Sequence, residues 1–533
     1  MTAESAALRG RVAPWRGVRG LAPAASVGFA GALVAALFLR MMTLGLRRDE
    51  QLYATPVALL SDHALYVDFF YNHMPGSAYL FHAMGWLTGD LGVLFTARFT
   101  VFLFWLFLLC VGGVLVRRMT GCWTVTAFFL LALVTDEILL GPAGMAGSNN
   151  FPTLALGLAG ALLFLRGAVS ARPNVAIIAA AGVLLGLAAS FKASAVAFVA
   201  PAAVAAFMLP LGAAPRERIS MTVLPLAAGG LIGATPFLLH FFADPIGFVA
   251  HAVSYHSGPH VAYWTAQNGV ADDVAMSLTE RLALFVSLAG SGATALVLLA
   301  ATLCGSALWP GRALLSGPAA ARIAVAAGMA GANAAVALIP APAFPQYFAP
   351  SFASLLLVAT ALYMALDDGA RALVRPTLAA ACVVMLALAS PRLGLAAIEG
   401  LSLRSWTPIA TQRAGAALAD RLSALGLEGR VATLAPIYPL EGGLPVYPEL
   451  ATGQFAYRVA PYADPKLFAR YRTVGPDTVE AMLAAEPPAA ILLGFEPQLE
   501  VPMRRFAKEH GYAPIPEFTI SDRYGDGRAY VKR

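Results

Sequence analysis

The chain has little charge and little cysteine. Asp, Glu, Lys and Arg make up only 12% of its 533 residues, whereas 59% are hydrophobic. A soluble chain of this length would form about three or four domains, but this composition excludes that organisation, a disordered chain and a secreted enzyme. The four cysteines lie in or beside apolar segments, so the pattern indicates no disulfide framework.

The charge is also unevenly distributed. Residues from Arg392 onward hold 15 of the 30 acidic and 16 of the 36 basic residues. Before that point the basic residues occur in small groups between apolar runs, without interleaved aromatic residues, so the net charge of +6 indicates membrane topology and no nucleic-acid partner. We predict a polytopic α-helical membrane domain over residues 1–391, followed by a soluble α/β domain over residues 392–533.

About eleven apolar runs are long enough to cross a bilayer. They lie near residues 22–45, 91–115, 122–141, 152–166, 174–191, 195–210, 221–242, 282–304, 323–340, 350–366 and 376–391. The loops on one side hold fourteen basic residues and those on the other side five. The positive-inside rule therefore places the amino terminus in the cytoplasm and the soluble tail outside. The first run resembles a signal peptide at its start, but without a small-residue cleavage site we interpret it as a retained anchor.

The soluble tail lacks familiar catalytic motifs. It contains no GxGxxG, P-loop, CxxC or defensible Ser-His-Asp pattern. Its hydrophobic pattern predicts strands at 431–434 and 490–493, a helix at 501–510, and closing strands at 517–520 and 528–532 around a turn at 522–527. We interpret this domain as a lid, an acceptor docking surface or a scaffold.

Polar residues of the membrane domain gather in two predicted outer loops, 46–90 and 243–281. These loops hold seven of the eight histidines when His240 is counted at the membrane edge. Function is therefore predicted on the outer face. The alternative is that long loops collect every polar residue type because they have room for them.

Asp49 and Glu50 directly follow the first apolar run. Carboxylates at the edge of a membrane span must meet water, cations or a reacting group, because burying them in hydrocarbon is costly. A partly desolvated carboxylate suits a general base for an acceptor hydroxyl or amine, since burial raises its pKa. Two alternatives stay open: a ligand for a divalent cation, and simple neutralisation of Arg47 and Arg48.

The rest of this loop is rich in aromatic and polar residues. Aromatic faces suit a sugar ring, and amide or imidazole groups hydrogen-bond hydroxyls. The candidate contacts for an acceptor or a sugar are Tyr53, Tyr71, Asn72 and His73. An acidic DE-x-x-Y is followed by a Pro75-Gly76-x-x-Tyr-Leu segment, a glycine and Arg98. This order resembles the GT-C membrane glycosyltransferases, and more narrowly the bacterial branch similar to protein mannosyltransferases and to the aminoarabinose transferases of lipid A.

The resemblance implies an activity. In that family the acidic residue after the first span activates the acceptor, and a sugar on a polyprenyl phosphate is transferred with inversion on the outer face of the membrane. Asp49 is thus expected to be the catalytic base, with Glu50 as its acidic neighbour. The implied partners are a polyprenyl-phosphate-linked sugar, membrane lipids and a glycan, lipid or protein acceptor, at the bacterial cytoplasmic (inner) membrane.

The sequence departs from the family pattern after the third predicted span. Many relatives have a carboxylate there, whereas residues 141–150 offer only amides and a hydroxyl. Asp136 and Glu137 are predicted inside the span. Either they reach the site from within the membrane, or Asn149 and Asn150 replace the carboxylate by hydrogen bonding. Amides are poorer ligands for hard cations, so a divalent metal cofactor is left open.

Lys192 is the one lysine of the membrane domain and is predicted at an outer turn. An ammonium group there favours an anion such as the carrier phosphate, with snorkelling to lipid headgroups as the alternative. His256 and His260 suit sugar or phosphate contact, against purely structural or interfacial roles. Tyr347 is expected near the carrier head by analogy with the family.

Two other functions remain alternatives. An O-antigen ligase or polymerase would use a diphosphate-linked donor and several loop arginines, but Arg281 is the only arginine in the fourth outer loop. A transporter or lipid flippase would show matched broken spans and charges in mid-membrane, for which only Asp136 and Glu137 are candidates.

Overall fold

The computed structural model describes residues 18–170, 172–267, 274–315 and 317–532. Eight helices in these ranges are long and apolar enough to cross a membrane, and three shorter apolar helices accompany them. The membrane helices are α1 (Val18–Thr43), α5 (Val93–Thr120), α6 (Trp123–Val134), α8 (Asn150–Ala168), α9 (Val175–Phe191), α10 (Val196–Met208), α12 (Leu224–Ala243), α17 (Gly292–Leu308), α18 (Gly317–Ala337), α19 (Ala349–Ala365) and α20 (Asp368–Gly400). Each predicted apolar run overlaps one of them, which confirms the polytopic helical class.

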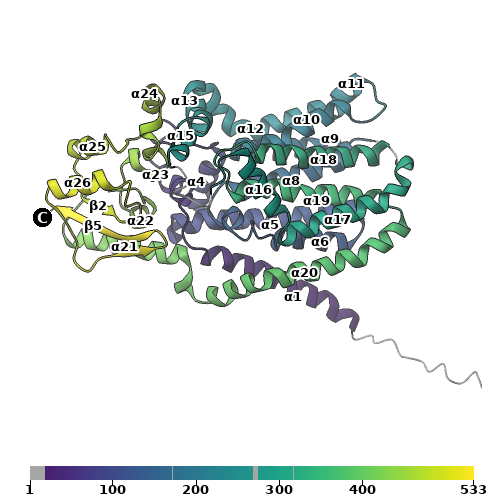
Figure 1. Cartoon of the computed structure of the whole chain (residues 1–533), viewed down its shortest axis with the longest axis horizontal. Coiled ribbons are helices and arrows are strands. Elements are labelled where there is room, and N and C mark those ends of the chain that lie inside the picture. Colours follow the sequence, from purple (N-terminus) through teal and green to yellow (C-terminus); the bar gives the residue numbers. More distant parts are fainter. Residues whose placement is uncertain (1–17, 171, 268–273, 316, 533) are drawn as a thin grey trace, which may run out of the picture.

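The helices run side by side along the long axis of the molecule, and the tail lies at one end of the bundle (Figure 1). Short helices fill the loops at that end. They are α2 (Glu50–Tyr53), α3 (Pro56–Leu59), α4 (Gly76–Thr88), α7 (Pro142–Met145), α13 (Pro245–Val249), α14 (Tyr255–Ser257), α15 (Pro259–Ala266) and α16 (Leu278–Ala289). On the opposite side of the bundle, α11 (Pro215–Arg218) precedes α12.

Two predicted spans differ from the observed helices. The run at 122–141 ends as helix α6 at Val134, because the Asp136 carboxylate accepts hydrogen bonds from the backbone N–H groups of Ile138 and Leu139 and turns the chain. Asp136 and Glu137 therefore lie in the loop after α6. The prediction that they lie inside the span is wrong.

The run at 282–304 is two helices. A capping box of Ser277 and Glu280 starts α16, and the chain turns at Gly290 and Ser291 before α17 begins at Gly292. Gly292 has a φ of +50°, a conformation that glycine adopts without strain. The short amphipathic helix α16 thus precedes the eighth membrane helix and lies beside the loops.

The tail is a mixed α/β domain, as predicted. Its sheet has the order β1-β2-β5-β3, with β1 and β2 parallel, β2 and β3 antiparallel to β5, and β4 paired to β5 in a hairpin. The strands are β1 (Val431–Thr433), β2 (Ala490–Leu493), β3 (Tyr512–Pro514), β4 (Ile520–Asp522) and β5 (Gly525–Lys532), and the helices are α21 (Thr407–Ala424), α22 (Ile437–Glu441), α23 (Gln454–Tyr457), α24 (Pro465–Phe468), α25 (Val479–Ala485) and α26 (Val501–Glu509).

Most predicted elements of the tail are confirmed. The strands at 431–434 and 490–493 and the helix at 501–510 match β1, β2 and α26. The predicted strand at 517–520 is wrong in position, because β4 begins at Ile520 and the hairpin turns at residues 523 and 524. Helix α20 continues past the predicted domain boundary at 391/392 to Gly400.

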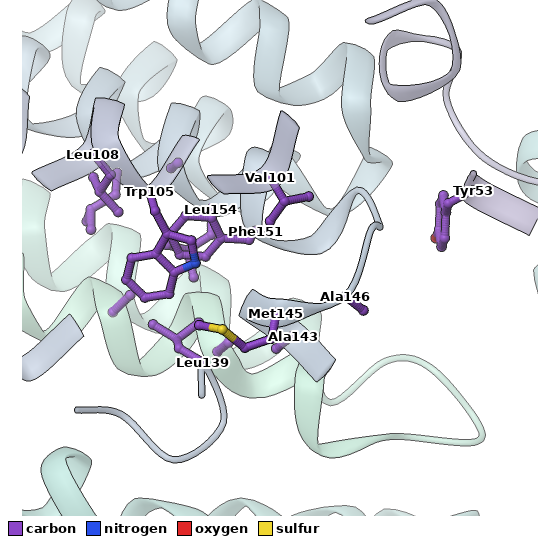
Figure 2. Packing of buried hydrophobic residues seen from close by; sticks show 14 of the residues in the cluster. Tyr53, Val101, Trp105, Leu108, Leu139, Ala143, Met145, Ala146, Phe151 and Leu154 are labelled. Atoms are coloured by element: carbon purple, nitrogen blue, oxygen red, sulfur yellow. The ribbon is translucent and has the colours of Figure 1, made fainter. Parts of the chain in front are cut away.

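A buried aromatic pair fixes the loop between α6 and α8. Trp105 stacks on Phe151 with ring centroids 4.0 Å apart, and its indole N–H donates to the Gly144 carbonyl at 2.8 Å (Figure 2). Gly147 follows in the same loop, where an added Cβ would lie 2.8 Å from the Cβ of Ala97. Only glycine therefore lets this loop approach α5 so closely, and the approach places a backbone N–H beside the candidate site.

Several contacts attach the tail to the bundle. Arg48 forms an ion pair with Glu496, and its backbone N–H donates to the Tyr524 hydroxyl at 3.0 Å. At the other side of the tail, the Glu441 carboxylate accepts a hydrogen bond from the Leu94 N–H at 2.8 Å, at the first turn of α5. A carboxylate at this position satisfies one of the free donors of a helix amino terminus, so the two domains pack as one unit.

Candidate active site

A large cavity of about 1710 Å³ opens where the loops meet the tail. A volume above about 1000 Å³ exceeds that of common small-molecule pockets, so it has room for two substrates. Nine of the twelve residues predicted for the site line it: Asp49, Tyr53, Asn72, His73, Asn150, Lys192, His256, His260 and Tyr347. Residues from distant parts of the sequence thus line one cavity.

The neighbours Asp49, Glu50 and Gln51 have three different surroundings: the cavity, the helix α5 and the tail. The Asp49 carboxylate lines the cavity and accepts no hydrogen bond from the described residues. Glu50 is fully buried and forms an ion pair with Arg98 at 2.8 Å. The Gln51 side chain accepts a hydrogen bond from the Ile437 N–H of the tail at 3.0 Å. Only Asp49 is left available to a ligand.

Glu50 does not face the cavity. Its two oxygens accept from both Nε and Nη2 of Arg98, each at 2.8 Å, and also from the backbone N–H groups of Gly147 at 2.8 Å and Arg47 at 2.9 Å. Arg98 in turn donates to the carbonyls of Met41 and Leu44. With four acceptor contacts filled, Glu50 has no capacity left for a substrate, so its position corrects the expectation that it shares the catalytic work of Asp49.

The surroundings of Asp49 tune its acidity. Burial raises the pKa of Asp49 above its ordinary value, and the charge of Glu50 adds to this. The cations Arg47, Arg458 and Lys192 act in the opposite direction and lower the pKa. A carboxylate with a raised pKa and no protein partner is suited to take a proton.

Lys192 is held at the start of a turn between α9 and α10. Its Nζ donates to the Asn150 side-chain oxygen at 2.5 Å and lies 5.0 Å from the centre of the Tyr347 ring. No carboxylate forms an ion pair with it among the described residues. Burial lowers the pKa of Lys192 to about 8, with the charge of Asp49 acting against this. The group is therefore an ammonium near neutral pH that lacks an anion.

Three histidines of the two loops, His73, His256 and His260, line the cavity. His73 stacks on Tyr53 with ring centroids 4.8 Å apart and lies 5.1 Å from the His256 ring. His256 Nε2 donates to the Asn72 carbonyl at 2.6 Å. Burial lowers the pKa of His256 to about 4 and that of His73 well below its ordinary value. These imidazoles are neutral at physiological pH and serve as hydrogen-bonding groups, without charge for a phosphate.

Three predicted residues lie behind the cavity wall. Tyr71 is buried and its hydroxyl shares a 2.8 Å hydrogen bond with the Ser77 hydroxyl. Asn149 is buried and its amide donates to the Phe191 carbonyl at 2.9 Å. Tyr71, Asn149 and Glu50 do not line the cavity, because each of them joins two segments of the chain. Direct contact of Tyr71 and Asn149 with a substrate is therefore not supported.

Several cavity residues were not among those predicted for the site from the sequence. Glu137 lines the cavity from the loop after α6, and Gln454 and Arg458 reach it from α23 of the tail. Glu137 was misplaced with its span. Gln454 and Arg458 belong to no motif, and nothing in the sequence shows that a tail residue returns to the first loop.

The part of the chain that the structure describes contains no cluster of side chains that could bind a metal ion. Groups of three or more His, Cys, Asp or Glu side chains arranged to hold a metal ion are absent from it. Asp272 and Asp273, in the fourth loop, lie outside the described residues.

The long apolar helices, the two loops and the attached tail define a polytopic membrane protein with a GT-C-like fold, as predicted. Among solved structures, the chain is similar to ArnT from Cupriavidus metallidurans. For the form bound to undecaprenyl phosphate the sequence identity is 16% and the TM-score 0.55, over 95% of this chain and 97% of that chain. For the apo form the values are 15% and 0.57, over 95% and 98%.

The Archaeoglobus fulgidus oligosaccharyltransferase shows a weaker similarity, with 13% identity and a TM-score of 0.46 over 93% of this chain and 74% of that chain. No family model and no curated protein matches the chain. The identities are low, so the similarity to ArnT establishes the fold, and the activity has to be argued from the site.

Proposed function

We propose that this protein is a GT-C glycosyltransferase that moves a sugar from a polyprenyl-phosphate donor to a glycan, lipid or protein acceptor. The observation that carries the proposal is Asp49. Its carboxylate lines a cavity large enough for two substrates, its pKa is raised by burial, and no described residue occupies it by hydrogen bonding. Carboxylates in such surroundings are candidates for acid-base catalysis.

In the proposed reaction, Asp49 accepts a proton from the acceptor hydroxyl or amine. The acceptor oxygen or nitrogen bonds to the anomeric carbon of the donor sugar while the bond from that carbon to the phosphate oxygen breaks. The electron pair of the broken bond stays on the phosphate, which leaves as polyprenyl phosphate. Attack from the face opposite the leaving group inverts the anomeric centre.

Lys192 supplies the charge that this leaving group needs. The phosphate gains negative charge as the bond breaks, and an ammonium already held in place by Asn150 and the Tyr347 ring would stabilise it without reorganising. ArnT of Cupriavidus metallidurans has been solved with undecaprenyl phosphate bound. This agrees with a carrier phosphate at Lys192 in a chain of the same fold.

The neutral groups of the cavity wall are assigned to hydroxyl contacts. Tyr53, Asn72 and His73 line the cavity next to Asp49, and His256 and His260 line it from the fourth loop. Aromatic rings and uncharged imidazoles suit a sugar better than a phosphate. The arginine distribution supports an outward-facing position for this end of the bundle, with the amino terminus in the cytoplasm.

The test is Asp49→Asn in the full-length protein. Membranes with this variant should transfer label from a polyprenyl-phosphate sugar to envelope acceptors at least about 100-fold more slowly, because general-base catalysis contributes about that much or more. Binding of undecaprenyl phosphate and the melting temperature should stay at the wild-type level. Asp90→Asn, which changes an exposed carboxylate near the same loop, is the matched control. Full activity of Asp49→Asn would remove the mechanism.

A further inference from the structure

Arg458 is a cation that the tail inserts into the cavity. It follows α23, is only 7% exposed, and lines the cavity wall. Its guanidinium lies among three aromatic rings, 4.9 Å from the centre of Tyr263, 5.3 Å from Trp264 and 5.1 Å from Phe455. The rings fix the plane of the guanidinium and hold it in place.

This buried charge has no anionic partner within the described ranges. None of the ion pairs found there includes Arg458. Glu496, whose carboxylate is close enough to feel its charge, is already paired with Arg48. The Tyr255 hydroxyl, which interacts with the Arg458 side chain, is neutral. Asp49 feels the charge of Arg458 but forms no ion pair with it. A buried guanidinium without a counter-ion is costly, so a ligand anion is the partner that the site lacks.

Neighbouring polar groups on the same wall also lack partners. The Nε2 atom of Gln454, which is 5% exposed, the indole N–H of Trp264 and Nδ1 of His260 are buried without a hydrogen bond. All three residues line the cavity together with Arg458. Buried polar groups are normally satisfied, and several unsatisfied ones around one cation indicate a site built for a polar ligand.

We propose that Arg458 and Gln454, with the rings of Tyr263 and Trp264, form an oxyanion subsite that binds a phosphate or carboxylate of the acceptor. The acceptor class is then an anionic sugar or glycolipid. This inference rests on the proposed transferase function and deepens it. It also gives the tail a direct part in substrate binding.

The geometry favours the acceptor over the donor phosphate. Lys192 lies between the membrane helices α9 and α10, where an isoprenoid carrier has access. Arg458 comes from the soluble tail, on the side from which a water-exposed acceptor enters. Both cations lower the pKa of Asp49, and all three residues line the same cavity, so both subsites lie within electrostatic reach of the base.

The experiment uses the full-length protein in nanodiscs and two probes, glucose 1-phosphate and glucose. Binding is measured by calorimetry with and without saturating undecaprenyl phosphate. Glucose 1-phosphate should bind in both conditions and clearly more tightly than glucose. Displacement of glucose 1-phosphate by undecaprenyl phosphate would assign Arg458 to the donor and overturn the acceptor subsite.

Variants identify the subsite. Arg458→Gln should weaken glucose 1-phosphate about tenfold or more, because a charge-assisted hydrogen bond is lost, and leave undecaprenyl phosphate within about twofold. Arg458→Lys should keep part of the affinity, and Gln454→Met, which removes one donor and little volume, should weaken binding without unfolding. Arg505→Gln, in an exposed pair with Glu480, is the control. Equal binding by wild type and both Arg458→Gln and Gln454→Met would refute the subsite.

The same data separate this inference from the proposed function. If the wild-type protein fails to bind undecaprenyl phosphate but Arg458 still binds the sugar phosphate, the donor assignment fails and the anion site stands. If undecaprenyl phosphate binds and Asp49→Asn is inactive while the Arg458→Gln variant binds both probes normally, the transferase stands and the acceptor subsite fails.

Discussion

The neighbours Asp49 and Glu50 carry the same charge, but Asp49 lines the cavity whereas Glu50 is fully buried in an ion pair with Arg98. Their variants should therefore differ in stability and in activity. Glu50→Gln keeps the size and shape of the side chain and removes its charge. The Arg98 guanidinium is then left fully buried without a counter-ion, because Glu50 is its ion-pair partner. The amide also presents one oxygen where the carboxylate presented two, so some of the four donors around it lose an acceptor.

The magnitude follows from the burial of both partners. Removing one member of a buried, hydrogen-bonded ion pair costs about 3–5 kcal/mol. For a chain of 533 residues, this corresponds to a decrease of about 3–4 °C in Tm when the usual unfolding entropy per residue applies. Asp49→Asn removes a carboxylate that no described residue binds, so it should leave Tm within about 1 °C of wild type or raise it.

The assay is thermal unfolding of purified full-length variants together with sugar transfer by the same preparations. Asp49→Asn is expected to be stable and inactive, whereas Glu50→Gln is expected to be destabilised, with residual transfer by the correctly folded fraction. A double-mutant cycle with Arg98→Gln isolates the pair, because removing both charges avoids the uncompensated guanidinium. The double variant should therefore lose less stability than the sum of the two single variants.

Two results would refute this reasoning. A wild-type Tm for Glu50→Gln would show that the ion pair contributes nothing. Strict additivity in the cycle would show that Glu50 and Arg98 act independently. A third result, loss of transfer by a fully stable Glu50→Gln, would return Glu50 to the catalytic machinery.

Two predictions concern pH. Burial lowers the pKa of Lys192 to about 8, so the affinity for undecaprenyl phosphate should fall by up to about tenfold per pH unit above pH 8. Below about pH 7 the phosphate monoester itself becomes protonated, so the affinity should be highest between about pH 7 and 8. Lys192→Arg should extend this plateau to higher pH, and an unchanged profile in that variant would exclude Lys192 as the phosphate ligand. Burial raises the pKa of Glu441 to about 7 from 4.5, so the folded state binds the proton more tightly, and stability should fall by up to about 3 kcal/mol as the pH rises from 4.5 to 7. Glu441→Gln should flatten this slope in unfolding measurements between pH 5 and 8, and a persistent slope would assign it to other groups.

The fold was accessible from the sequence because membrane helices depend on length and hydropathy, both of which are local properties. The errors arose where a single polar contact overrides the apolar run. Asp136 ends α6 by accepting two backbone N–H groups, and the capping box at Ser277 starts a separate helix α16. Hydropathy averaged over a window does not register either contact, so both spans were predicted too long or merged.

The site was predictable only in part, for a related reason. Asp49 and Lys192 carry scarce charges at the edges of apolar runs, and scarcity alone marks them. Arg458 is one of 16 basic residues after residue 391, where charge is common, so its role depends on the docking of the tail. Glu50 carries the same signal as Asp49 in the sequence, and only the ion pair with Arg98, 48 residues further along the chain, distinguishes it from Asp49.

The order Asp49-Glu50-Gln51 links these observations. Glu50 fixes the short helix α2 to α5 through Arg98, which leaves the preceding residue to face the cavity and the following one to face the tail. The Gln51 contact with Ile437 joins this segment to the domain that carries Arg458. The position of the base and the docking of the tail therefore depend on one rigid turn. The tail thus contributes Gln454 and Arg458 to the wall of the cavity that Asp49 also lines, and the segment that carries Asp49 contacts the tail directly through Gln51.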